Sequence, residues 1–259
     1  MQTSVILTIV CVSLAITGKA EDSQKAEARN NHTLTVQEKL KGFESGSVTL
    51  EEMTEDGGAP LRQEIIRYYT NDTSRVSVKA KLVVSRCFAM EHDFQTAAQL
   101  AEQYAAVYTN DYRGWRILGG ASYMLDRNER AFDAYKKAVA LGDETSYAPL
   151  AGSALDLNRL DAVREIVPQL LRIKNSQDPP KFVKLDIVGV LAIYARKAED
   201  KDVFLKALEG EKFQDILSRD DVAAAVDKTC QHFQSIEVDA ICQKVHEAAV
   251  LRKDSGPLK

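Results

Sequence analysis

DYRGWRILGGASYMLDRNERAFDAYKKAVALGD, residues 111–143, is the stretch of sequence that decides the fold. Apolar residues recur along it at helical spacing, and the polar pair Asp126-Arg127 interrupts them once. This pattern predicts one helix over about Asp111–Leu125 and a second over Asn128–Leu141. Because so short a break forces two helices to pack antiparallel, the stretch predicts a helical hairpin.

Six residues of this hairpin have a spacing that resembles the signature of the 34-residue tetratricopeptide repeat (TPR). They are Trp115, Leu118, Gly119, Ala131, Tyr135 and Ala138. Small residues at Gly119 and Ala131 let the two helices approach closely, while the aromatic residues fill the space beside that contact. The chain departs from the family pattern at two positions, since Ser122 stands where the family usually has Tyr and Asp143 replaces the usual closing Pro.

The flanking sequence repeats the hairpin more weakly. Ala97 lies 34 residues before Ala131, and Ala162 lies 31 residues after it; each opens a second helix just after a turn. We therefore predict repeats at about 78–111, 112–143 and 144–175, a degenerate helical pair at 180–209, and a terminal cap from segments 211–217, 220–234 and 236–252. The resemblance implies an all-α fold in which antiparallel hairpins stack as a TPR-like right-handed superhelix, an α-solenoid.

The first twenty residues differ from the rest and resemble a signal peptide. Val5–Thr17 is an apolar run, too short for a comfortable bilayer span, and Gly18-Lys19-Ala20 follows it. We expect cleavage after Ala20 and a secreted or periplasmic protein, although Met1–Ser4 carries no Lys or Arg and an uncleaved anchor is the alternative. No other segment reaches the length of a membrane span.

The remaining chain divides by composition into four parts. Residues 21–58 are polar and should be loosely ordered, with short helical patterns around Val36–Phe43 and Thr49–Met53. From Pro60 the helical pattern is continuous, which predicts a repeat array over 59–209, a cap over 210–252 and a tail over 253–259. The net charge of −4 gives no reason to expect nucleic acid as a partner.

The resemblance also implies a binding surface, because stacked hairpins of this family often hold a partner's peptide on the concave face lined by the first helix of each pair. The matching positions are Lys79, Leu82 and Arg86 in the first repeat, Arg113, Arg116, Gly120 and Tyr123 in the second, and Tyr147 and Ala151 in the third. Since Arg forks around carboxylates, the ligand hypothesis is an acidic segment or a C-terminal carboxylate. The alternative is that these are ordinary solvated side chains.

After cleavage three cysteines would remain. Cys87 reads as a buried free thiol. If 220–234 and 236–252 form a hairpin, Cys230 and Cys242 lie at nearly mirrored distances from its turn, so an exported protein could join them by a disulfide; two separate thiols are the alternative. Cys242 and His246 share a helix face, but no full ligand set accompanies them, and we expect no metal and no cofactor.

No catalytic motif of useful specificity is present in the sequence. The leading hypothesis is therefore a non-enzymatic scaffold or adaptor that binds a protein or peptide. The alternatives are a recognition subunit of a larger hydrolase or transport assembly, and an enzyme with a divergent site in the groove. Asn31 and Asn71 begin glycosylation acceptor patterns, whose use depends on the source.

Overall fold

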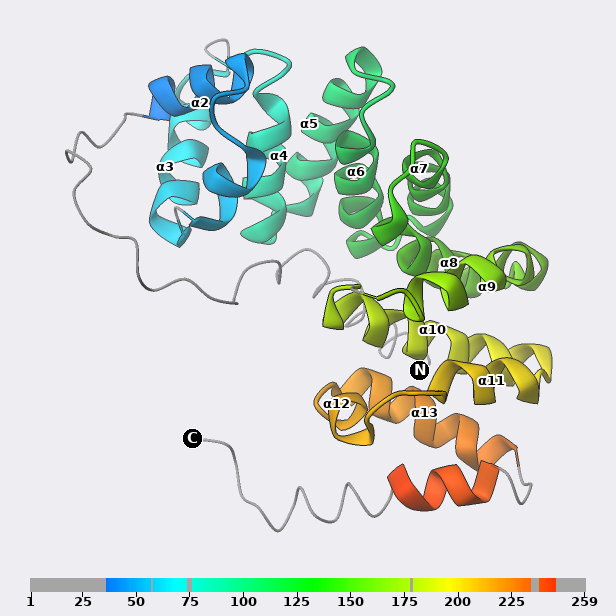
Figure 1. The fold of residues 1–259 in the computed structure, drawn as a ribbon. Coiled ribbons are helices and arrows are strands. Elements are labelled where there is room, and N and C mark those ends of the chain that lie inside the picture. Colours follow the sequence, from blue (N-terminus) through cyan, green and yellow to red (C-terminus); the bar gives the residue numbers. More distant parts are fainter. Residues whose placement is uncertain (1–35, 57, 74–75, 178, 234–237, 246–259) are drawn as a thin grey trace. The chain divides into compact units, whose positions relative to one another are not determined.

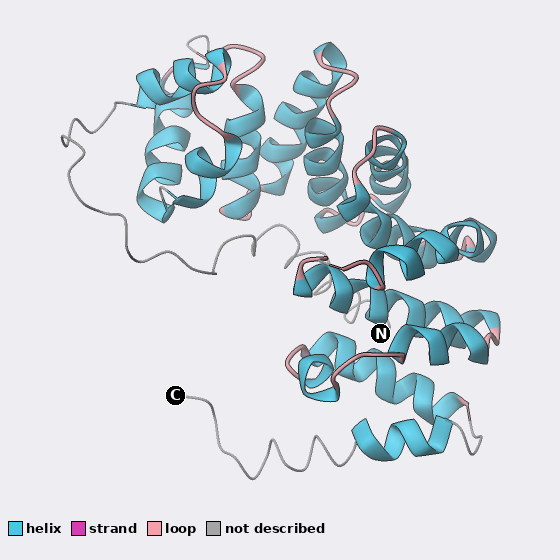
Figure 2. Cartoon of the chain, in the orientation of Figure 1, coloured by secondary structure: helices cyan, strands magenta, loops and turns pink. Residues whose placement is uncertain are grey.

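A computed structural model describes residues 36–56, 58–73, 76–177, 179–233 and 238–245. Within these ranges the chain is helical with short loops and contains no strand (Figure 2). The prediction of an all-α fold built from antiparallel helical hairpins is confirmed. The predicted signal peptide, the Asn31 acceptor pattern, His246 and the tail 253–259 lie outside the described residues.

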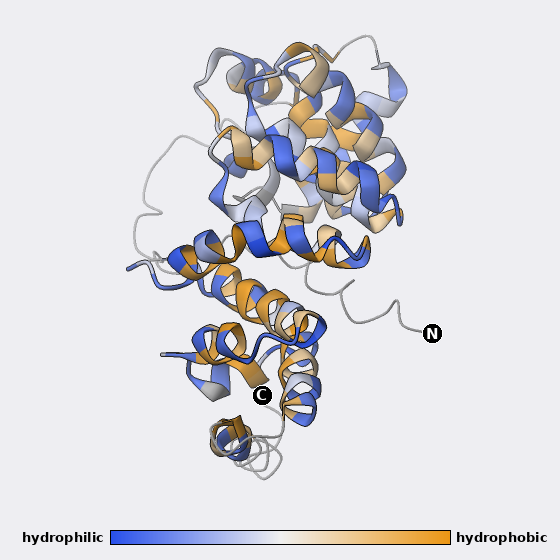
Figure 3. Cartoon of the chain, turned by 90° about the vertical axis from the view of Figure 1, so that its right-hand side faces the viewer, coloured by the Kyte–Doolittle hydropathy of each residue, from blue (hydrophilic) through white to orange (hydrophobic). Residues whose placement is uncertain are grey.

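The chain contacts divide at Gly142 and Asp143 into two compact units, and this division falls inside the predicted array 59–209. We call the described residues up to Gly142 the N-terminal unit and those from Asp143 the C-terminal unit. In both units hydrophobic and hydrophilic residues alternate in bands along the helices, as expected for helices that bury one face (Figure 3). None of the described helices is both long and apolar enough to cross a membrane.

The N-terminal unit is a run of helices in which sequence neighbours pack against each other (Figure 1). Its elements are α2 (Val36–Ser45), the π-helix η1 (Glu52–Asp56), α3 (Gly58–Asn71), α4 (Lys81–Met90), α5 (Phe94–Val107), α6 (Tyr112–Met124) and α7 (Asn128–Ala140). Helices α6 and α7 are the hairpin predicted from 111–143, and their ends lie within one or two residues of the predicted ones.

The segment expected to be loosely ordered contributes to the core of this unit. The short helical patterns predicted around Val36–Phe43 and Thr49–Met53 correspond to α2 and to the turn that leads into η1. Five apolar side chains of these elements are buried: Val36, Leu40, Phe43, Leu50 and Met53. Helix α2 packs against α3, and η1 packs against α3 and α4. Part of 21–58 is therefore held by apolar burial against the first repeat.

The turns inside the three hairpins have one shared geometry. His92, Asp126 and Asn158 adopt left-handed φ values of 65°, 57° and 56°. In each turn the next residue's N–H donates to the carbonyl oxygen five positions earlier: Asp93 to Phe88 at 2.9 Å, Arg127 to Ser122 at 2.9 Å and Arg159 to Ala154 at 2.8 Å. This is the Schellman end of a helix, which satisfies carbonyls that the helix itself leaves without partners.

These turns set the register of the repeat and correct one expectation. The fifth residue after each left-handed position is Ala97, Ala131 and Val163, and all three are fully buried. Ala162, expected at the third position, is only half-buried. The expectation is one residue off because it followed the identity of a small side chain, whereas the turn after α8 places the next residue on the buried face.

The C-terminal unit continues with hairpins and a central apolar helix. Its elements are the 3₁₀ helix η3 (Glu144–Ser146), α8 (Tyr147–Asp156), α9 (Leu160–Lys174), α10 (Lys181–Ala198), α11 (Lys201–Leu208), α12 (Phe213–Leu217) and α13 (Asp220–His232). Helix α10 is buried on nearly all sides because α8, α9, α11 and α13 pack against it. A helix that is apolar all round is typical of such a central position.

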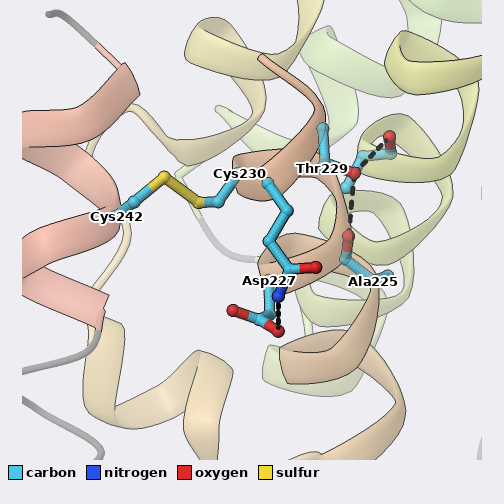
Figure 4. Close-up of a disulfide and its surroundings, with 7 residues drawn as sticks. Ala225, Asp227, Thr229, Cys230 and Cys242 are labelled. Atoms are coloured by element: carbon cyan, nitrogen blue, oxygen red, sulfur yellow. Dashed lines mark hydrogen bonds between the residues drawn. A yellow bond between two sulfur atoms is a disulfide. The ribbon is translucent and has the colours of Figure 1, made fainter. Parts of the chain in front are cut away.

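Two cysteines join the end of this unit. Cys230 on α13 forms a disulfide with Cys242, which belongs to the helical residues 238–245 (Figure 4). Thr229, the neighbour of Cys230, donates its hydroxyl to the carbonyl oxygens of Ala192 at 3.0 Å and Ala225 at 2.8 Å. The predicted bond between Cys230 and Cys242 is thus present, and Cys87 is a buried free thiol as predicted.

Candidate functional site

The predicted groove residues differ strongly in exposure. Arg86 and Tyr123 are buried, with 8% and 2% of their surface exposed. Leu82, Gly120 and Ala151 are buried too. Lys79 is half-buried and donates a hydrogen bond to the carbonyl oxygen of Glu44. Arg113 and Arg116 are the predicted arginines that remain partly exposed.

Packing of the first helices explains the buried positions. Helix α4, which carries Arg86, is contacted by α3, η1, α5 and α6. Helix α6, which carries Tyr123, is contacted by α4, α5 and α7. In the third repeat, Tyr147 at the start of α8 is half-buried. The structure therefore does not bring the predicted residues together on one exposed face, and the accessible arginines lie near the start of α6.

The turn that precedes α6 is fixed by Asp111. Its carboxylate accepts the backbone N–H of Arg113 at 3.0 Å, which caps α6, and two bonds from the Arg113 guanidinium at 2.9 Å from Nε and 2.6 Å from Nη2. The Tyr104 hydroxyl of α5 donates to the same carboxylate at 2.6 Å. One carboxylate therefore ties the end of α5 to the first turn of α6.

The charge state of this cluster follows from its contacts. Burial raises the pKa of Asp111, but the hydrogen bonds from Arg113 and Tyr104 outweigh burial and hold the pKa below its ordinary value. For Tyr104, burial and the bond to the Asp111 carboxylate both raise the pKa. At neutral pH the site therefore contains an ionised Asp111, a neutral Tyr104 and a charged Arg113.

Trp115 also stabilises the turn between α5 and α6. Its indole N–H donates to the Thr109 carbonyl oxygen at 2.9 Å. The Lys137 ammonium of α7 lies 4.0 Å from the centre of the indole ring, a cation–π contact. Trp115, predicted as a structural signature residue, thus also links the turn to the second helix of its hairpin.

Three apolar side chains on this braced turn face solvent. Val107 is 60% exposed, Tyr108 37% and Tyr112 36%, and they are the large hydrophobic residues with notable exposure in the described part of the chain. We call Val107, Tyr108 and Tyr112 the tyrosine surface. Residues 107–113 line an open hollow of about 650 Å³. The hollow is open to solvent, so a partner would lie across it rather than be enclosed by it.

Both tyrosines are held in place. The Tyr108 ring stacks on Tyr104 with centroids 4.7 Å apart and an angle of 27° between the planes. The Arg116 guanidinium carbon lies 5.5 Å from the centre of the Tyr112 ring. Since Tyr104 is itself fixed by Asp111, the exposed rings sit on a rigid support.

The tyrosine surface was not among the sequence-predicted site residues. The sequence shows Tyr104, Tyr108 and Tyr112 at intervals of four. Helical spacing alone would place such residues on one buried stripe. Helix α5 ends at Val107 and α6 begins at Tyr112. Tyr108 and Tyr112 therefore lie beyond the end of α5 and do not continue its buried face. The sequence feature that could have revealed this surface is the turn at Asn110-Asp111, which lies between Tyr108 and Tyr112.

Comparisons with known proteins identify a structural similarity but no family. No model of a protein family matches this chain. No curated protein matches it either. Among solved structures it is similar to one described as "Crystal structure of MamA protein", with 20% sequence identity, a TM-score of 0.45, and coverage of 67% of this chain and 88% of that chain. A similarity of this size carries no argument about function.

Proposed function

We propose that this chain is an exported, non-enzymatic helical scaffold that binds a protein partner through an acidic segment of that partner, held at the start of α6. The observation that carries the proposal is the pairing of exposed tyrosines with Arg113 on one immobilised turn. Tyr, Trp and Arg dominate the energetics of protein interfaces, because they combine apolar area with directional hydrogen bonds. A repeated hairpin supplies the rigid frame that such a contact needs.

The charges around the turn support an acidic partner. Arg113 uses Nε and Nη2 on Asp111, its Nη1 has no bond to any residue that the structure describes, and 36% of the side chain is exposed. The Arg113 guanidinium neutralises the Asp111 carboxylate that it binds, so this pair has no net negative charge. Arg116 and Lys137 add two further positive charges nearby. A carboxylate is the group that an outward-facing guanidinium edge binds best.

Export rests on the leader-like residues 1–20 and is supported by the Cys230–Cys242 bond. Disulfides form and persist in oxidising compartments. The mature chain would then begin at Glu21 and meet its partner outside the cytoplasm. N-terminal sequencing of the native protein tests this part of the proposal, and a chain that still begins at Met1 would contradict it.

Partner binding is tested in two steps with the mature chain. Co-purification from the native compartment identifies the partner, and a synthetic peptide covering its acidic segment is then titrated by calorimetry. Arg116→Glu should weaken binding of the peptide at least about tenfold, since the substitution reverses a charge beside the site. Arg164→Glu is the matched control, because Arg164 is an exposed arginine of α9 in the C-terminal unit.

Two results would contradict the proposal: equal binding by wild type and Arg116→Glu, or a partner whose contact segment carries no Asp or Glu. Circular dichroism and the melting temperature of both variants establish that they are folded. The identity of the partner also separates a structural assembly from a hydrolase or transport assembly in which this chain would serve as the recognition subunit.

A further inference from the structure

The tyrosine surface has an arrangement that acidic recognition alone does not explain. Single exposed hydrophobic residues are common on proteins. Here three of them fall within six residues of sequence, at the end of α5 and the start of α6, and beside a hollow. A guanidinium needs no such neighbours in order to bind a carboxylate from solvent.

The exposed tyrosine side chains are already ordered in the free protein. Ordering a mobile side chain at an interface costs about 0.5–1.5 kcal/mol. Tyr108 is stacked on Tyr104, and Tyr112 is held against Arg116. The turn itself is fixed by Asp111 and by the bond from Trp115 to Thr109. Immobilised exposed aromatic rings can therefore bind an apolar group without this loss.

The Arg113 guanidinium and the exposed tyrosine rings belong to the same short segment of chain. Arg113 lies one residue beyond Tyr112, and both line the hollow with Tyr108. In an extended peptide, side chains of adjacent residues point to opposite sides, and those two residues apart lie roughly 7 Å from each other on one side. An apolar residue and a carboxylate two positions apart can thus reach the rings and the guanidinium together.

We infer that the tyrosine surface recognises an extended acidic segment by one large apolar side chain, which packs against Tyr108 and Tyr112 and lies two positions from the carboxylate that pairs with Arg113. This inference rests on the proposed function and adds the apolar requirement to it. The hollow is open, so a chain can pass through it, and the carboxylate is that of an internal Asp or Glu.

A display library of random twelve-residue peptides, selected on the mature full-length chain, tests the inference. A parallel selection uses the Tyr108→Ala/Tyr112→Ala variant, whose changes lie on exposed side chains. Enriched peptides should combine Phe, Trp, Leu or Met with an Asp or Glu two positions away. By fluorescence anisotropy, replacing the apolar residue with Ser, or using the double variant, should each raise Kd at least about tenfold. Tyr108→Phe/Tyr112→Phe should retain binding, because the rings remain.

The outcomes separate the inference from the proposed function. Enrichment of acidic peptides without an apolar residue, with Kd unchanged in the double alanine variant, overturns the inference and leaves the proposed function standing. Enrichment of peptides that lack Asp and Glu, or no enrichment at all, overturns both. Displacement of the peptide by a twenty-nucleotide oligothymidylate would overturn both the inference and the proposed function in favour of nucleic-acid binding. Retained binding by a C-terminally amidated peptide supports an internal carboxylate, and lost binding contradicts it.

Discussion

The ring of Tyr135 lies directly over Gly119, and a Cβ at that glycine would come within 2.8 Å of the ring carbon Cδ1. The equivalent pairs, at the same distances from the left-handed turn residue, are Ser85 with Ala101 and Ala151 with Val167. The largest side chain on α7 thus faces the smallest residue on α6. In this hairpin the absence of a side chain at Gly119 makes room for the Tyr135 ring.

Gly119→Ala should lower the free energy of unfolding by about 1–2 kcal/mol. Overpacking a close contact costs roughly 1–3 kcal/mol. The better helix propensity of Ala returns about 1 kcal/mol or less. In a Tyr135→Val background, which reproduces the Ala151–Val167 pair, the same Gly119→Ala change should be neutral or stabilising. Urea denaturation of the four proteins gives the coupling energy, and equal effects of Gly119→Ala in both backgrounds would refute the size matching.

Much of this hairpin geometry was predictable because it depends on local sequence. The expected break at Asp126-Arg127 contains one left-handed residue, and the turns expected before Ala97 and Ala162 contain the other two, His92 and Asn158. Turn residues and helical periodicity act over a few positions, so one sequence displays them. The position of Val163 was missed by one residue because the register depends on the turn conformation rather than on residue identity.

The exposure of the candidate site was not predictable in the same way. Arg86 and Tyr123 stand at positions that resemble a groove, yet they are buried because the neighbouring helices of the run cover them. Arg113 was named for its charge, but its strongest contact is Asp111, which the sequence shows only as a turn residue. The packing of helices and turns decides whether a charged side chain is a binding group, a structural group or both.

Asp111→Asn should destabilise the N-terminal unit near neutral pH, by roughly 1.5–3 kcal/mol, because hydrogen bonds to a charged group are lost. The pKa of Asp111 is lowered in the folded protein. Its contribution is therefore complete above the unfolded pKa of about 3.9 and disappears as the pH falls through the lower folded value. Unfolding free energies of wild type and variant should differ at pH 7 and converge towards pH 3. A constant difference across that range would contradict the assignment.

Lys174→Met should cost about 3–5 kcal/mol of stability in the C-terminal unit. The Lys174 side chain is fully buried, and its ammonium donates to the Glu209 carbonyl oxygen at 2.7 Å and to Glu211 at 3.3 Å. Without it the Glu211 carboxylate, 9% exposed, is left buried without its counter-charge. Adding Glu211→Gln should recover part of the loss, because no buried charge then remains.

Lys181→Met is the matched control for that experiment. Lys181 pairs with Asp215 at 2.6 Å, but 62% and 38% of the two side chains are exposed. Exposed ion pairs contribute about 0–1 kcal/mol, so the control should change the unfolding midpoint little. If both lysine variants lose the same stability, burial of Lys174 is not the reason for its effect.

Alkylation should distinguish the free thiol of Cys87 from the disulfide-bonded Cys230 and Cys242. Burial raises the pKa of Cys87 to about 12, so this thiol should resist alkylation in the folded chain at pH 8. In denaturant without reductant, the chain from Glu21 onward should take up one alkyl group per molecule, and with reductant three, as counted by mass spectrometry. Three groups without reductant would exclude the Cys230–Cys242 bond.

Removing that bond should destabilise the end of the C-terminal unit. The two cysteines are 12 positions apart, and closing a loop of this size restricts the unfolded chain by about 3 kcal/mol. Cys230→Ser/Cys242→Ser should therefore unfold at lower urea concentration, and hydrogen exchange should rise most in residues 238–245, which the bond ties to α13. Exchange that rises first in α4–α7 would contradict this, because those helices belong to the other unit.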